Sequence, residues 1–176
     1  MRRRKDARRS NQLNASEIRW QLLLLMLTFA GLDQATKWLA NTALRPELSV
    51  PVIPKVFQWT LTYNTGAAFS LFHQVPNLLT AFSTLLFLAL AAYSFLPVRS
   101  QNVENWALGL LLGGALGNLL DRLFNGRVTD FVDFVLIHYP VFNGADTFIF
   151  FGALLLIASH LFGNDAKGNH IRKKTG

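Results

Sequence analysis

Four long apolar segments with few charged residues constrain the fold of this chain more than any other feature. They cover residues 18–40, 75–96, 106–124 and 147–162. A helix needs about 20 apolar residues to cross the ~30 Å hydrocarbon core of a bilayer, and each segment is near this length. A soluble domain would distribute its charge along every segment, whereas most of the charge in this chain lies outside them. The pattern therefore predicts an all-α membrane protein with four transmembrane helices.

The basic residues predict how these helices are oriented. Both ends of the chain are strongly basic, with "MRRRKDARRS" first and "KGNHIRKKTG" last. An even number of crossings places both ends on one side, and the positive-inside rule makes that side the cytoplasm. We therefore expect a basic cytoplasmic tail over residues 1–17, a four-helix membrane domain over 18–163 with outer loops at about 41–74 and 125–146, and a second basic tail over 164–176.

The start of the chain also fits a cleaved signal peptide, because a basic stretch precedes an apolar one. The apolar segment is long, however, three more segments follow it, and Asp33, Gln34 and Lys37 lie in its last turns. These features are not typical of a signal peptide. We expect the segment to be a retained transmembrane helix.

Composition excludes several classes of function. The chain has no cysteine, which excludes disulfides, thiolate catalysis and cysteine-ligated metals. Its four histidines do not have the spacing of a metal-binding helix such as His-x-x-x-His. The net charge of +7 is concentrated in the tails and is not interleaved with aromatic residues, so it does not indicate binding to nucleic acid. We expect neither a metal nor another cofactor.

The first outer loop contains a strand pattern. In "VFQWTLTY", at residues 56–63, β-branched and aromatic residues alternate with polar ones. We therefore expect a small sheet outside the bilayer, on the outer side of the four helices.

The third apolar segment combines small residues with a polar cluster. Glycines recur every four residues from Gly109 to Gly117, so they lie on one helix face and allow another helix to approach closely. At its outer end this face leads to Asn118, Asp121 and Arg122. A structural role at the helix end, or anchoring at lipid headgroups, explains Asp121 and Arg122 better than direct catalysis does.

Asp33 and Lys37 lie four residues apart in the first apolar segment. This spacing brings opposite charges together on one helix face. Two interpretations stay open at this point. The pair either neutralises itself at the outer interface, with Lys37 extending toward the headgroups, or forms a polar patch for substrate or lipid.

Three aspartates, Asp130, Asp133 and Asp146, lie within residues 127–148. If Asn143 caps the fourth helix, Asp146 occupies its third position, where the helix dipole favours a carboxylate, and this structural role alone would account for it. The chain between the third and fourth helices also allows Asp130 and Asp146 to meet at the outer helix ends. Two adjacent carboxylates share a proton, so one can activate water while the other polarises a carbonyl group. The pair therefore fits an aspartic peptidase.

Five motifs, taken together, resemble those of the lipoprotein signal peptidase (signal peptidase II) family. They occur in the family's order over nearly the whole chain apart from the tails. They are "DQATK" (33–37), "NTGAAFS" (64–70), "GGALGNLLDR" (113–122), "GRVTDF" (126–131) and "FNGAD" (142–146). The long basic N-terminal tail lies outside the family's motifs.

The resemblance implies an aspartic peptidase of the bacterial inner membrane that removes signal peptides from diacylglyceryl-modified prolipoproteins. Such an enzyme cleaves before the lipidated cysteine, contacts membrane lipid, acts as a monomer without a cofactor and is inhibited by globomycin. Its four transmembrane helices are accompanied by a small extramembrane β-cradle.

The resemblance also assigns roles to single residues. The catalytic role falls on Asp130 and Asp146. Asp133 lies outside the motifs, and we expect it to be a local polar or capping residue. The residues expected to shape the site, or to bind substrate or inhibitor, are Asp33, Lys37, Asn64, Gly66, Asn118, Asp121, Arg122 and Asn143.

Two other functions fit the sequence less well. A small proton or ion transporter would use Asp33, Asp121 and Asp146 as relay groups, but it would place carboxylates deep in the bilayer and repeat one half of the chain in the other. The acids instead cluster at one surface, and the two halves do not resemble each other. A presenilin-like peptidase would contain Gly-x-Gly-Asp, which this chain lacks.

Overall fold

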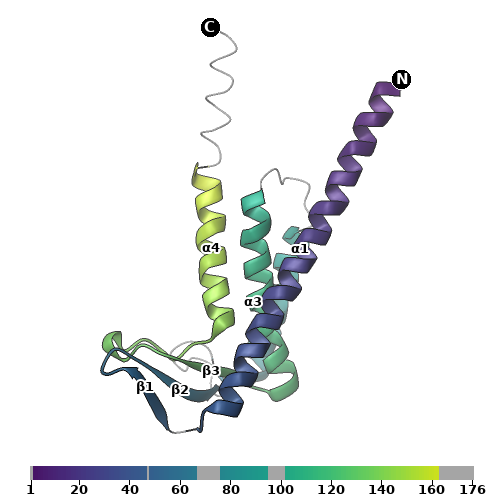
Figure 1. The fold of residues 1–176 in the computed structure, drawn as a ribbon. Helices are drawn as coiled ribbons and strands as arrows, with labels where there is room; N and C mark the ends of the chain where they lie inside the picture. Colours follow the sequence, from purple (N-terminus) through teal and green to yellow (C-terminus); the bar gives the residue numbers. More distant parts are fainter. Residues whose placement is uncertain (1, 47, 67–75, 95–101, 163–176) are drawn as a thin grey trace.

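The structure, a computed structural model, describes residues 2–46, 48–66, 76–94 and 102–162. Within these residues four helices pack together, with a small sheet at one end of them (Figure 1). The helices are α1 (Arg2–Ala43), α2 (Pro76–Ser94), α3 (Asn102–Asn125) and α4 (Gly144–Phe162). The strands are β1 (Ser49–Ile53), β2 (Phe57–Asn64) and β3 (Val128–Asp133), and a short 3₁₀ helix, η2 (Val135–Ile137), follows β3. The predicted helical fold with a small sheet is confirmed.

Helix α1 begins much earlier than its apolar segment. It begins at Arg2, so most of the segment predicted as a separate tail over residues 1–17 continues the helix. The physical reason is that the chain contains neither proline nor glycine before Gly31, and residues 1–17 include five arginines, which favour helices.

Two of the described helices are long and apolar enough to cross a membrane, Val103–Asn125 in α3 and Gly144–Phe162. The described apolar stretch of α2, Thr80–Ser94, is shorter. The apolar part of α1 contains Asp33 and Lys37. Length and composition therefore support two crossings, and the predicted four stay a prediction.

Large apolar side chains cover the outward faces of the helices. A soluble monomer rarely exposes so much contiguous apolar surface. Helices surrounded by lipid are expected to expose it. The exposed side chains include Leu24, Leu27 and Trp38 on α1, Phe82 and Leu85 on α2, and Phe150, Leu154 and Ile157 on α4.

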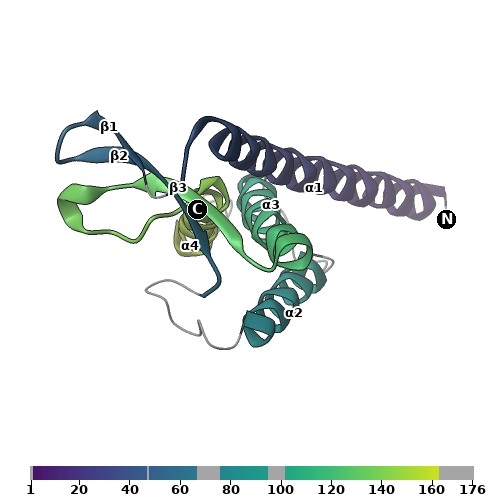
Figure 2. The same ribbon diagram turned by 90° about the horizontal axis from the view of Figure 1, so that it is seen from below.

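Helix α3 lies among the other three helices (Figure 2). Its glycines allow this close packing, as the four-residue repeat predicted. A methyl group added at Gly113 would lie 2.5 Å from the Phe29 Cβ atom of α1, and one added at Gly114 would lie 2.5 Å from the Ala145 carbonyl oxygen of α4. The glycines therefore set how closely α1 and α4 approach α3.

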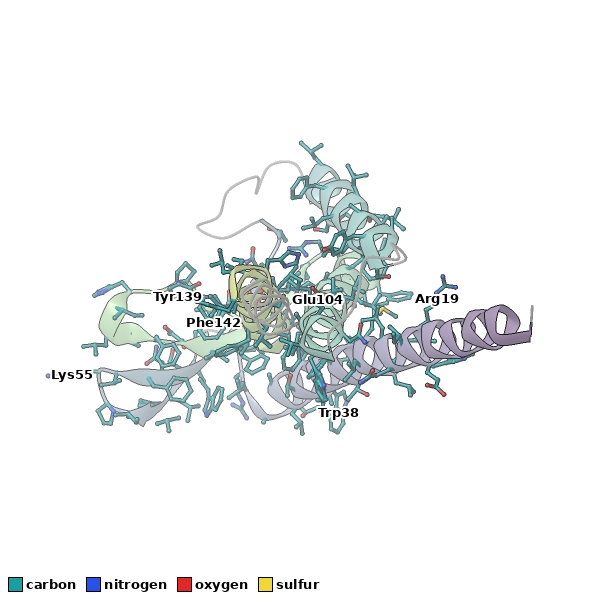
Figure 3. The ribbon with its side chains drawn as sticks, turned by 90° about the horizontal axis from the view of Figure 1, so that it is seen from above. Arg19, Trp38, Lys55, Glu104, Tyr139 and Phe142 are labelled. Atoms are coloured by element: carbon teal, nitrogen blue, oxygen red, sulfur yellow. The ribbon has the colours of Figure 1, made fainter. Side chains whose placement is uncertain are left out.

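The sheet has the order β1-β2-β3, and both strand pairs are antiparallel. The strand predicted over residues 56–63 is confirmed as β2. Strand β3 was expected only as a connecting segment, because its partner β2 lies two helices earlier in the sequence. At the far end of the sheet from the helices, Lys55 turns the chain from β1 to β2 with a φ of 63° (Figure 3).

The sheet is held against the helices by a small apolar core. Ala40 near the end of α1 packs with Leu61 of β2 and Phe131 of β3, and all three side chains are buried. Because Asp130 precedes Phe131, this packing places the Asp130 backbone next to the helix ends.

Candidate active site

Asp130 lies on β3 and is almost fully buried, with 2% of its surface exposed. Its Oδ1 atom accepts a hydrogen bond from Asn143 Nδ2 at 2.6 Å, and its Oδ2 atom accepts one from Asn64 Nδ2 at 3.1 Å. The pKa of the Asp130 carboxyl is raised to about 7, mainly because the side chain is buried and also because Asp146 is nearby. The two hydrogen bonds and the charge of Lys37 act in the opposite direction.

Asp146 occupies the third position of α4, as the sequence predicted. Asn143 is the N-cap, and its Oδ1 atom accepts the Asp146 backbone N–H at 3.0 Å. In return, Asp146 Oδ2 accepts the Asn143 backbone N–H at 3.3 Å, which completes a reciprocal capping pair. Asn118 of α3 donates to the other Asp146 oxygen, Oδ1, at 2.9 Å. Asp146 therefore has a structural role and also faces the polar cluster.

The chain between β3 and α4 explains how the two carboxylates meet. After β3 it passes through η2 and returns, so that Phe142 pairs with Val132. The Val132 N–H donates to the Phe142 carbonyl at 2.8 Å, and the Phe142 N–H donates to the Val132 carbonyl at 3.0 Å. Phe142 thus lies beside the start of α4 (Figure 3). This pairing places Asn143, the next residue, against Asp130.

Asn143 joins the two acids. It is fully buried, and its side chain contacts both the Asp130 carboxyl and the backbone of Asp146. Its Nδ2 atom also lies 3.1 Å from Asn118 Oδ1 and 3.3 Å from the Thr129 carbonyl oxygen. One amide therefore fixes the relative position of β3, α3 and α4 at the site.

Lys37 lies at the centre of a buried ionic cluster. Its Nζ atom is 2.7 Å from Asp33 Oδ2, 3.1 Å from Asp121 Oδ2 and 2.9 Å from Asn118 Oδ1. Only 2% of Lys37 is exposed. The interpretation in which Lys37 extends toward the headgroups is therefore wrong, because its three partners lie inside the protein. The Asp33–Lys37 pair predicted from the spacing is confirmed.

Asp33 also caps α4 from outside that helix. Its Oδ1 atom accepts the Ala145 backbone N–H at 2.8 Å, so α1 satisfies one of the unpaired donors at the start of α4. Gly117 of α3 makes room for this carboxylate, since a methyl group at that position would overlap Asp33 Oδ2. The motifs at residues 33–37 and 113–122 therefore come into contact because residue 117 has no side chain.

Asp121 has the structural role that the sequence favoured. Its Oδ2 atom accepts the Thr129 backbone N–H at 3.0 Å, which ties the end of α3 to β3. Gln34 was not singled out from the sequence, yet its Nε2 atom donates to Asp121 Oδ1 at 3.2 Å and to the Gly117 carbonyl at 3.0 Å. Its place inside "DQATK" was the only available signal.

No salt bridge joins Arg122 to the adjacent Asp121 in the described structure. Its Nη1 atom donates to the Asn118 carbonyl oxygen at 3.4 Å. The guanidinium interacts electrostatically with Asp146, Asp130 and, most weakly, Asp121. Arg122 therefore supplies positive charge to the site from α3.

Asn64 brings β2 into the site. While its Nδ2 atom donates to Asp130, its Oδ1 atom accepts the Gly66 backbone N–H at 2.9 Å, which fixes the amide orientation. The rest of that motif, residues 67–70, lies outside the described residues. Two residues that the sequence did not indicate secure this end of β2: Arg127 lies 3.7 Å above the Tyr63 ring, and Tyr63 donates to Asn41 Oδ1 at 2.9 Å.

Asp133 is separated from the two site acids. Its Oδ2 atom accepts hydrogen bonds from Gln58 Nε2 at 2.7 Å and from Thr60 Oγ1 at 2.8 Å, both on β2. The local polar role expected for it is confirmed, and the polar contacts run across the sheet rather than to a helix end.

An apolar cavity of about 300 Å³ lies between α1 and the sheet. Trp59 and Phe131 line it together with Leu39, Ala40 and other residues near the end of α1. Asp130 and Phe131 are successive strand residues and therefore point to opposite faces of the sheet. The cavity is thus separate from the two acids.

The arrangement supports acid–base chemistry. Among the described residues, no group of three or more His, Cys, Asp or Glu side chains is placed to hold a metal ion. The site instead offers a buried carboxyl that titrates near neutral pH beside a second carboxylate. Such a pair holds one proton and presents one acid and one base to a water or a carbonyl group.

Comparison with known proteins gives consistent results. The family model described as "Signal peptidase (SPase) II" matches residues 25–162. The chain is 45% identical to the lipoprotein signal peptidase of Gloeobacter violaceus over 80% of its own length and 81% of the relative's. It is 39% identical to that of Hydrogenovibrio crunogenus, with 86% and 90% of the two chains covered.

Solved structures agree with the sequence comparisons. A structure described as a bacterial membrane enzyme superposes with a TM-score of 0.74 at 28% identity, covering 83% of this chain and 90% of the other. A second structure with the same description gives a TM-score of 0.71 at 29% identity, covering 80% and 92%.

Proposed function

This chain belongs to the lipoprotein signal peptidase (signal peptidase II) family, and we propose that it removes signal peptides from diacylglyceryl-modified prolipoproteins by an aspartic mechanism. Cleavage occurs before the lipidated cysteine of the substrate. Asp130 and Asp146 are the catalytic pair. One observation supports this most directly: the buried Asp130 carboxyl, with its pKa near 7, is joined through Asn143 to Asp146.

The mechanism needs one proton shared between the two acids. The ionised carboxylate takes a proton from water as the hydroxide oxygen attacks the carbonyl before the cysteine, and the protonated carboxyl donates to the carbonyl oxygen. The resulting diol collapses when the carbon–nitrogen bond breaks: the carboxylate takes a proton from one diol hydroxyl, and the carboxyl gives its proton to the leaving amine nitrogen. Each step returns one carboxyl and one carboxylate.

The amides around the pair are placed to stabilise charge that develops in the transition state. Asn64 and Asn143 contact Asp130, and Asn118 contacts Asp146. Fixed donors of this kind need no reorganisation during the reaction. The remaining residues that shape the site, Asp33, Lys37, Asp121 and Arg122, hold α1, α3, β3 and α4 together around it.

In the membrane, we place four crossings with both termini in the cytoplasm and the pair near the outer surface of the bacterial inner membrane. The exposed apolar faces of the helices and the position of the sheet at one helix end support this. The substrate's signal helix reaches the site from the lipid, and the enzyme acts as a monomer.

The structure favours this function over a proton or ion transporter. Asp33 and Asp121 both form ion pairs with Lys37 and both accept backbone N–H bonds, so they are held in place as structural groups. A relay would need carboxyls that are free to exchange protons.

The test is cleavage of a lipidated prolipoprotein by the purified full chain, followed as a mobility shift on a gel. We expect a shift that globomycin abolishes. Precursor that lacks the diacylglyceryl group should stay uncleaved. Cleavage of the unlipidated precursor, or cleavage that ignores globomycin, would contradict the proposal.

A further inference from the structure

We infer that Lys37 is a positioning residue which, through Asn118, holds Asp146 as the ionised member of the pair, so that Asp130 bears the shared proton. The inference rests on the proposed function for its catalytic meaning. It goes further in two ways. It says which aspartate is the acid and which is the base, and it names the residue outside the pair that determines this assignment.

The first step is the orientation of the Asn118 amide. Its Oδ1 atom lies 2.9 Å from Lys37 Nζ. An ammonium group only donates, so the atom that faces it must be the amide oxygen. Asn143 Nδ2 donates to the same oxygen at 3.1 Å. The Asn118 Nδ2 atom therefore has to face Asp146.

The second step concerns what Asp146 receives. Asn118 Nδ2 lies 2.9 Å from Asp146 Oδ1, and the Asn143 backbone N–H lies 3.3 Å from Oδ2. Both of these groups are donors only, and donors favour the ionised form of a carboxyl. Asp146 also lies in the first turn of α4, where the helix dipole favours negative charge.

The third step is the contrast with Asp130. It also accepts two amide donors, but it lies on a strand and not in the first turn of a helix. It is 2% exposed, whereas Asp146 is only partly buried. Burial disfavours the charged form most strongly at Asp130. The shared proton is therefore placed on Asp130, and Asp146 is left to activate the water.

The charged groups packed around the pair are few. Helix α1 contributes Lys37 and Asp33, and α3 contributes Asp121 and Arg122. Among these, only Lys37 contacts the Asn118 oxygen through its side chain in the described structure, since Arg122 reaches the Asn118 backbone. Lys37 is thus the one cation among these groups that, together with the neutral Asn143 donor, orients the Asn118 amide.

The proton assignment is tested by infrared titration of the full chain in detergent, without substrate. A protonated carboxyl has a characteristic C=O stretch. We expect a band that titrates near pH 7 and disappears in Asp130→Asn. A band that persists in Asp130→Asn and disappears in Asp146→Asn would overturn the assignment. Because no substrate is present, failure of the lipoprotein cleavage assay would contradict the proposed function alone.

The role of Lys37 is tested with two double variants, Lys37→Gln/Asp121→Asn and Lys37→Met/Asp121→Asn. Both remove one positive and one negative charge, so the net charge of the ionic cluster is unchanged. Glutamine keeps an N–H donor for Asn118, whereas methionine has none. We expect the glutamine variant to keep the C=O band of a protonated Asp130. In the methionine variant the proton should no longer favour Asp130 over Asp146.

Kinetics give a second readout for the same pair of variants. The methionine variant should lose about 10- to 100-fold in kcat relative to the glutamine variant, with KM little changed, since the hydrogen bond that Asn118 donates to the Asp146 carboxylate is no longer held in place. Its pH profile should also shift. Equal kcat values and equal pH profiles in the two variants would show that Lys37 acts only as an ion-pair partner, which would overturn the inference.

Discussion

Two pairs of aspartates lie in one hydrogen-bond network at the same end of the helices, and they differ in what joins them. Asp33 and Asp121 are joined by the Lys37 ammonium. Asp130 and Asp146 are joined by the Asn143 side chain and backbone. The Lys37 ammonium forms an ion pair with each carboxylate of the first pair and so fixes both in place. A neutral amide forms no ion pair, so the second pair retains a proton that can be exchanged.

The comparison shows that the task of a buried acid depends on its partners as well as on its burial. Asp33 and Asp130 are both almost completely buried. Asp33 binds a lysine and caps a helix, which are structural tasks. Asp130 has only amide partners, and its pKa is raised to about 7. The predictions below test this contrast, beginning with the largest expected effect.

The amide-linked pair should be indispensable for cleavage. We expect Asp130→Asn and Asp146→Asn to reduce cleavage of a lipidated prolipoprotein by about 10²- to 10⁴-fold, because acid and base catalysis are lost. The measurement is the rate of the gel shift, with circular dichroism to show that each variant is folded. Asp133→Asn is the matched control and should retain substantial cleavage, because Asp133 contacts only β2. Normal processing by Asp146→Asn would rule out the pair.

The lysine-linked pair should matter chiefly for stability. Lys37→Met leaves Asp33 and Asp121 buried without their cation, so we expect a loss of about 3–5 kcal/mol in the free energy of unfolding. Thermal unfolding in one detergent measures it. Adding Asp121→Asn to Lys37→Met should recover part of the loss. If Lys37→Met melted at the same temperature as the parent chain, the structural role proposed for this pair would be contradicted.

The raised pKa of Asp130 should make stability depend on pH. The unfolded carboxyl titrates near 3.9 and the folded one near 7. Between these values the unfolded state ionises first, so stability falls by on the order of 4 kcal/mol as pH rises and is constant above about 7. Asp130→Asn should lack this dependence. The measurement is the melting temperature of the parent chain and of Asp130→Asn at pH 4.5 and 7.5. The same change in melting temperature between the two pH values for both proteins would contradict the prediction.

The smallest expected effect comes from Gly117, which makes room for the Asp33 carboxylate against α3. Gly117→Ala forces a methyl group onto the Asp33 carboxylate, and overpacking of this kind costs about 1–3 kcal/mol. Gly31→Ala in α1 is the matched control, because nothing lies within 4 Å of the added methyl group. It should be neutral or slightly stabilising. Equal melting temperatures for the two variants would argue against close contact at Gly117.

Much of the site was predictable because it depends on short-range spacing. The capping relation between Asn143 and Asp146, and the pairing of Asp33 with Lys37, both follow from helical geometry. Strand β3 and the bond from Gln34 to Asp121 were not predicted. Both depend on partners from elements far away in the sequence, where spacing contains no information.

The sequence by itself determined the helices, the strand β2 and the two local pairs, because each depends on residues within a few positions of one another. It also determined the family resemblance, because each of the five motifs is a short stretch of sequence. Only the tertiary structure decided that Lys37 points inward to Asn118 and Asp121, that Asp33 caps α4, and that Asn143 reaches Asp130. These contacts join different elements. They exist because glycines let the helices approach and because the β2–β3 pairing places Asp130 at their ends.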